Sequence, residues 1–218
     1  GPLSPAAAVT MSSSAPAPRR ALAGCCGAAG SHSNGQAKLG LLASGKLVLT
    51  SSRRWAYPYI PELARLFNKS PSTVGGTLAL LNATFVLASP FVPKVVARLG
   101  EDRVIIAALL GGAALNAMVA LTPGGAAFPV WTTSLALQGI VIAANDIALI
   151  INIGKVIASS NRGCAVGLVE LSWGLSGVVG IPLLGVLLNV SWRLPFVALG
   201  AAAVAVAATI FVFKRVTA

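Results

Sequence analysis

Four ionisable side chains interrupt long apolar stretches of the sequence, and they are the groups best able to do chemistry there. They are Arg53, Arg54, Asp146 and Glu170. A charge inside a bilayer costs about 2.5 to 3.5 kcal/mol on insertion scales, so such groups usually face protein or water and mark paths for ions or solutes. We expect Arg53 or Arg54 to bind an anionic group of the solute, and Asp146 or Glu170 to carry a proton. Lys46 is expected to extend to the membrane edge.

Three amide side chains recur at a helical spacing in one of these stretches. Gln138, Asn145 and Asn152 are seven residues apart, which is nearly two helical turns, so they form one polar stripe beside Asp146. One interpretation is a lining that offers hydrogen bonds to a polar solute. The other is bonding between helices, worth roughly 0.6 kcal/mol per bond. An arginine from the first stretch would pair with Asp146 if the two helices are neighbours.

The stretch from 163 to 188 combines a carboxylate with many glycines. Small residues let a neighbouring helix approach closely. Glu170 shares a helix face with Gly174 and Gly177, so we expect its carboxyl at a contact between helices. Two roles for this carboxyl are left open, the binding of a proton and a structural hydrogen bond. A proline in the stretch predicts a bend. The expected packing motif consists of Gly174, Gly177, Gly180, Pro182 and Gly185.

Composition places these residues in a membrane. The 218 residues are 56% hydrophobic and 10% charged, with a mean hydropathy of +0.84, whereas soluble domains carry about 25% charged residues. The surplus apolar surface must face lipid, so the bilayer is the expected partner. The net charge of +11 lies mainly between apolar runs, without a nucleic-acid-binding motif. We therefore expect no nucleic-acid partner.

Six apolar runs are long enough to cross about 30 Å of hydrocarbon as helices. They predict an all-α membrane protein with six transmembrane helices in a domain spanning 39–218. With six spans, both ends of the chain lie on the same side of the membrane. Basic residues are concentrated on that side, in agreement with the positive-inside rule. The expected spans are 39–60, 73–93, 104–122, 128–152, 163–188 and 194–213.

Residues 1–38 form a separate segment rich in Ala, Ser, Pro and Gly, with a few cations and no acid. A disordered tail and an organelle transit peptide both have this composition. The sequence therefore leaves two locations open, the plasma membrane and an organelle membrane such as a plastid envelope.

An enzymatic function has little support in the sequence. The single histidine, His32, lies in the leader, so neither a His-based zinc site nor a Ser-His-Asp triad is available in the membrane. Ser172 has no histidine partner. We expect no catalytic residue, no metal site and no cofactor.

One run of short motifs resembles a known family. After Asp146 the chain reads VGLVELSW at 166–173, GIPLLG at 180–185 and WRLPF at 192–196. In order and spacing this resembles the N-terminal six-helix half of a major facilitator superfamily transporter. The resemblance implies half of a twelve-helix bundle and secondary active transport of a small solute, with proton coupling or antiport as variants. Such proteins bind their solute between two halves, so a second six-helix half or self-association is an expected partner.

The chain departs from the family pattern in one loop. The family motif there is G-x-L-A-D-R-x-G-R-R, of which Arg98, Gly100 and Arg103 remain as a remnant of a gating loop. Its aspartate is replaced by Ala97, and Lys155 replaces an acid that follows Ile-Gly. These losses favour an alternative function, a degenerate non-transporting membrane module or a fragment that needs a second half.

Overall fold

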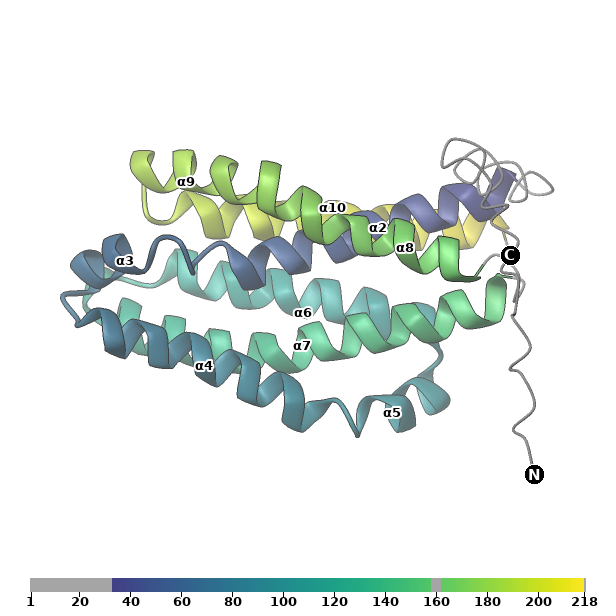
Figure 1. Ribbon diagram of the computed structural model, residues 1–218, viewed down its shortest axis with the longest axis horizontal. Coiled ribbons are helices and arrows are strands. Elements are labelled where there is room, and N and C mark those ends of the chain that lie inside the picture. The colour runs from purple at the N-terminus through teal and green to yellow at the C-terminus, as the bar shows by residue number, and fades with distance from the viewer. Residues whose placement is uncertain (1–32, 158–161, 218) are drawn as a thin grey trace, which may run out of the picture.

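The computed structural model describes residues 33–157 and 162–217, and the long helices of this part run side by side in one bundle (Figure 1). The all-α membrane fold expected from the sequence is confirmed. The helical segments are α2 (Ser33–Arg54), α3 (Ile60–Phe67), α4 (Pro71–Ala88), α5 (Val92–Leu99), α6 (Glu101–Leu121), the 3-10 turn η1 (Gly124–Ala126), α7 (Ala127–Val156), α8 (Arg162–Leu175), the π-helical segment η3 (Ser176–Gly180), α9 (Ile181–Val190) and α10 (Leu194–Thr217).

Within residues 33–157 and 162–217, five helical segments are long and apolar enough to cross a membrane: α4, α6, α7, the continuous run from α8 through η3 to α9, and α10. The first expected span, α2, is not among them. It has 22 residues, but it carries Lys38, Lys46, Arg53 and Arg54. It nevertheless packs within the bundle against α8 and α10. Its charges therefore need partners or water rather than lipid.

The first helix is displaced toward the N-terminus relative to the expected span. It begins at Ser33, so residues 33–38, which the sequence assigned to the leader, are helical. Residues 1–32 of the expected leader lie outside the described part. The helix stops at Arg54 rather than at residue 60. Pro58 explains the early end, because proline has no N–H and disfavours helical geometry in the residue before it. Pro61 lies in the first turn of the next helix, α3.

Proline also sets both ends of the second span. Ser70 caps α4 by accepting a hydrogen bond from the Thr73 backbone N–H at 3.2 Å, and Pro71 occupies the first helical turn. The helix ends before Pro90, so it stops short of the expected limit at residue 93. The chain then forms α5 and turns into α6 at Gly100, whose φ of +84° favours glycine.

The bundle is held by close packing of α6 against α7 and α10, and of α4 against α7. Ile105, Leu109 and Leu149 are buried between these helices. At Gly139 of α7, α4 comes so close that a Cβ would collide with the Thr84 hydroxyl and with backbone atoms of α4. This contact fixes the position of α4 on the bundle.

The two ends of the bundle differ in chemistry. One end is closed by aromatic rings from several helices, including Phe67 stacked on Trp131 at 5.1 Å and Trp55 edge-on to Phe196 at 5.4 Å. The start of α2 and the end of α10 lie together at the opposite end (Figure 1). Three lysines form ion pairs at this opposite end, which is called the positive end below.

Candidate functional site

A lysine buried inside the bundle pairs with the carboxylate of the fifth span. Lys46 of α2 is only 4% exposed and forms an ion pair with the Glu170 Oε1 atom of α8. The expectation that Lys46 extends to the membrane edge is therefore wrong, because its position on α2 directs it toward α8. Lys46, Thr50 and Arg53 follow i, i+4 and i+7 spacing, so they share the polar face of α2.

Asp146 of α7 belongs to the same group of charges. It lies within electrostatic range of Lys46, Arg53 and Glu170, and it accepts a hydrogen bond of 3.4 Å from the Asn145 Nδ2 atom. The predicted pairing of Asp146 with an α2 arginine is not found, although α2 and α7 are in contact. Asp146 of α7 is thus electrostatically coupled to the Lys46–Glu170 pair that joins α2 to α8.

Arg53 reaches from α2 to the second span instead. Its Nη2 atom donates to the Asn82 Oδ1 atom at 2.7 Å, and its guanidinium lies 4.7 Å from the centre of the Phe85 ring. The Asn82 Nδ2 atom in turn donates to the Tyr57 hydroxyl at 2.6 Å. Asn82 was not singled out in the sequence, because a lone amide in an apolar run has no distinctive spacing.

Arg54 reaches in the other direction, to α8. Its Nη1 atom donates to the Trp173 carbonyl oxygen at 2.9 Å, and its guanidinium stacks 4.3 Å from the Trp173 ring centre. The arginines therefore bridge α2 to opposite neighbours, α4 and α8. Their bonds go to neutral groups, so both positive charges are available to an anion. We call Lys46, Arg53, Arg54, Asp146 and Glu170 the intramembrane charge group.

The amide stripe of α7 turns mainly toward α6. The Gln138 Nε2 atom lies 3.3 Å from the Asn116 Oδ1 atom, and the Asn152 Nδ2 atom lies 2.9 Å from the Asp102 Oδ1 atom. Asn145 is completely buried, and its Oδ1 atom has no hydrogen-bond partner among the described residues. Of the two interpretations left open, these contacts favour bonding between helices for Gln138 and Asn152.

The glycine motif contacts α2 and the turn after it over only part of its length. A Cβ at Gly180 would lie 2.6 Å from the Ser51 Oγ atom, and one at Gly185 would collide with the Tyr59 ring. Gly177 lies near the Arg54 guanidinium, whereas a Cβ at Gly174 would meet nothing within 4 Å. The close approach therefore begins one turn later than expected, and Glu170 lies before it with its side chain 48% exposed.

The predicted bend takes the form of a π-helical segment, η3. It precedes Pro182, which lies at the second position of α9. Proline lacks an N–H and its ring clashes with the carbonyl four residues earlier, so a widened turn accommodates it. The Ser176 hydroxyl lies 3.1 Å from the Ser51 hydroxyl, and Tyr59 donates to the Ile181 carbonyl at 3.4 Å. α2 and the turn after it are thus fixed to the fifth span at its irregular turn.

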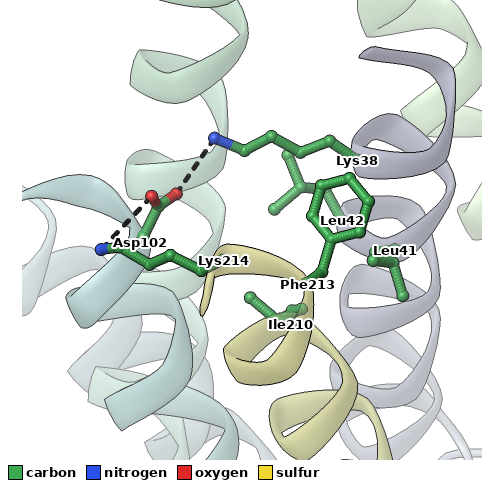
Figure 2. Close-up of a pocket in the computed structure, with 7 residues that line it drawn as sticks. All are labelled: Lys38, Leu41, Leu42, Asp102, Ile210, Phe213 and Lys214. Carbon is green, nitrogen blue, oxygen red and sulfur yellow. Dashed lines mark ion pairs between the residues drawn. The ribbon is translucent and has the colours of Figure 1, made fainter. Parts of the chain in front are cut away.

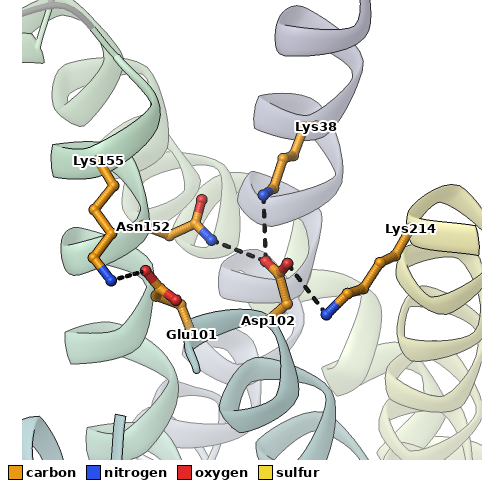
Figure 3. Close-up of polar contacts among 6 residues, drawn as sticks. All are labelled: Lys38, Glu101, Asp102, Asn152, Lys155 and Lys214. Carbon is orange, nitrogen blue, oxygen red and sulfur yellow. Dashed lines mark hydrogen bonds and ion pairs between the residues drawn. The ribbon is translucent and has the colours of Figure 1, made fainter. Parts of the chain in front are cut away.

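Asp102 organises a second polar cluster, at the positive end (Figure 3). Its carboxylate lies 3.3 Å from Lys38 Nζ and 3.6 Å from Lys214 Nζ, and it also accepts the bond from Asn152. Four helices, α2, α6, α7 and α10, therefore meet at one carboxylate. The adjoining pocket has a volume of about 60 Å³ and an apolar wall that includes Leu41 and Phe213 (Figure 2). This is too small for an organic solute, since ligand pockets measure about 300 to 1,000 Å³.

Two departures from the family loop pattern face each other in the same region. Lys155, at the end of α7, forms an ion pair with Glu101 at the start of α6 (Figure 3). After Gly100 the motif has two arginines, whereas this chain has Glu101 and Asp102. Lys155, which replaces an acid of the family pattern, is therefore paired with an acid at a position where that pattern has arginine.

Comparison with known proteins agrees with this architecture. The family model described as Major Facilitator Superfamily matches residues 42–218. Comparison with curated proteins gave no match. The matched region extends from α2 through α10 and contains the intramembrane charge group, so the chain belongs to the Major Facilitator Superfamily, a family of multi-pass membrane transporters.

Proposed function

We propose that the chain carries a small anionic solute across its membrane by secondary active transport, with the intramembrane charge group as the solute and proton site. The observation that supports this most directly is the Lys46–Glu170 ion pair. Glu170 lies eight residues beyond the start of α8, which is about 12 Å along the helix axis. A half-exposed carboxylate at that depth needs water or protein against it, because lipid cannot solvate the charge.

The balance of charge in this group favours an anion. Lys46, Arg53 and Arg54 supply three positive charges, whereas Asp146 and Glu170 supply two negative ones. One net positive charge is left when all five are ionised. An anionic group bound by the arginines neutralises it, and planar guanidinium groups suit carboxylates and phosphates.

The two carboxylates provide a means of coupling. A single lysine, Lys46, pairs with Glu170 and interacts electrostatically with Asp146. Protonation of Glu170 removes its charge and frees Lys46 to interact with Asp146, and loss of the proton restores the first pair. In this scheme Lys46 alternates between two partners as protons bind and leave, and Asp146→Asn removes the second partner.

A binding assay and a transport assay together test the proposal. Thermal unfolding of the purified chain in detergent is followed with inorganic phosphate, a monocarboxylate, a dicarboxylate and a neutral sugar, because a ligand that binds the folded state raises the melting temperature. We expect at least one anion to stabilise the protein, and Arg53→Gln and Arg54→Gln to weaken that effect. Arg65→Gln, which changes an exposed arginine of α3, is the matched control.

The transport arm uses proteoliposomes with an imposed pH gradient. Uptake of the stabilising anion should follow the gradient and should lose this dependence in Asp146→Asn. Stabilisation by the sugar alone, or equal responses of the arginine variants and the control, would contradict an anion site. Uptake that ignores the pH gradient would leave the anion site standing and remove the proton coupling.

A further inference from the structure

The short helix α5 has an exposed apolar face that the bundle does not cover. Val92 and Val96 are buried against the bundle, at 5% and 3% exposure. Phe91, at the helix start, and Val95 and Leu99 recur every four residues on the adjoining face, and they are 64%, 45% and 53% exposed. An apolar ridge of this kind is stable only against lipid or another apolar partner.

A row of cations follows this ridge around the helix. Lys94 and Arg98, also four residues apart, are exposed, as is Arg103 just beyond the Gly100 turn. Successive residues are about 100° apart around a helix. The order around α5 is therefore core-facing valines, exposed apolar ridge, then Lys94 and Arg98. Within the described part of the chain, these three cations form no ion pair.

The position of α5 along the bundle places it at a membrane surface. α4 has 18 residues and is a candidate membrane span, so it rises about 27 Å, close to the thickness of the hydrocarbon. α5 begins four residues after α4 ends, beside α6 and α7. Figure 1 shows it at the edge of the bundle, toward the positive end.

We propose that α5 is an interfacial helix that binds anionic phospholipids on the positive side of the membrane. The ridge of Phe91, Val95 and Leu99 contacts the acyl chains, and Lys94 and Arg98 contact the phosphate groups above them. This arrangement combines the two contributions that hold an amphipathic helix at a membrane surface, buried apolar area and attraction to anionic lipid. This role of α5 in lipid binding is independent of the proposed transport function.

Native mass spectrometry of the detergent-purified chain tests the charge contribution. Lipid binding is titrated with dioleoyl phosphatidylglycerol and, separately, with dioleoyl phosphatidylcholine. Each basic side chain near an anionic surface strengthens binding roughly fivefold. We expect K94Q/R98Q to lose about twentyfold or more of the preference for phosphatidylglycerol, and K94R/R98K to keep it.

A matched pair of cations near α3, at the end of the bundle opposite to the positive end (Figure 1), provides the control. Arg65 and Lys69 are also one arginine and one lysine, four residues apart and exposed. R65Q/K69Q should retain the phosphatidylglycerol preference. An equal loss in both double variants, or no loss in either, would overturn the proposal, since binding would then follow total charge or be independent of α5.

The apolar contribution needs a separate variant. V95S/L99S leaves the cations and the buried valines in place, so it should weaken binding of both lipids to a similar extent while the preference between them is retained. Unchanged binding of both lipids would overturn the role of the ridge. Melting temperatures of all variants, measured in parallel, identify any variant that fails to fold, and the two charge pairs are then compared as single substitutions.

Discussion

Lys46 of α2 and Glu170 of α8 lie 124 positions apart in the sequence and form an ion pair inside the bundle. Lys46 is almost fully buried, whereas the Glu170 side chain is about half exposed. The pair therefore fastens the first helix to the fifth span and leaves its acidic member accessible from one side. Loss of either partner affects both the packing and the charge of this region.

Replacing Glu170 alone should destabilise the fold more than replacing Glu170 and Lys46 together. Glu170→Gln leaves a buried lysine without its ion pair, and breaking a buried pair costs about 3 to 5 kcal/mol. Since Glu170 is half exposed, we expect a smaller loss, about 1 to 2 kcal/mol, or roughly 2 to 8 °C in melting temperature. K46M/E170Q should recover part of it. Thermal unfolding in detergent measures this, and additive effects of the two substitutions would show that they do not interact.

Reversing the Glu101–Lys155 pair should restore what each single substitution loses. Glu101→Lys and Lys155→Glu each place like charges together at the positive end, and the double reversal forms the pair again. Because Lys155 is 66% exposed, each single substitution should cost about 1 kcal/mol or less. A double-mutant cycle on melting temperature tests this. A double variant no more stable than the weaker single one would mean that the pair contributes nothing.

Asp102 should be the most sensitive acid at the positive end. Asp102→Asn removes the partner of two lysines and weakens the bond to Asn152. We expect a loss of about 1 to 2 kcal/mol, since its contacts are partly exposed. Glu62→Gln is the control, because Glu62 is exposed and forms no ion pair with the described residues. Equal melting temperatures for the two variants would refute a structural role for the Asp102 cluster.

Alanine should distinguish the two parts of the glycine motif. Gly180→Ala brings a methyl group within 2.6 Å of the Ser51 hydroxyl, and overpacking of this kind costs about 1 to 3 kcal/mol. Gly174→Ala meets no neighbour and should stabilise the helix by about 0.5 to 1 kcal/mol. Unfolding of each variant is compared with that of S51G/G180A, in which the clash is relieved. No rescue would show that the cost at Gly180 comes from another source.

Much of the fold can be predicted from the sequence, because the length of an apolar run and the spacing of its glycines are properties of one segment and can be recognised without knowing its neighbours in space. The proline positions account for where α2 and α4 end, although the expected spans ran beyond them. Contacts between helices are less accessible. Nothing near Lys46 in the sequence indicates Glu170. Asp146 was the expected partner of Arg53 or Arg54, but Arg53 binds Asn82, and a lone neutral amide in an apolar run gives no sign of such a contact. Such pairings depend on which helices become neighbours, and that is decided by the whole bundle.

The contrast between the two ends of the bundle has a consequence for its response to ionic strength. Added salt weakens the exposed carboxylate–lysine contacts around Asp102, since charges in water are screened over about 10 Å at 0.1 M. The same salt leaves the stacked rings of Phe67 and Trp131 intact or tightens them, because apolar association is not screened. Concentrated salt therefore loosens the molecule at one membrane surface only, the one where its first and last helices meet.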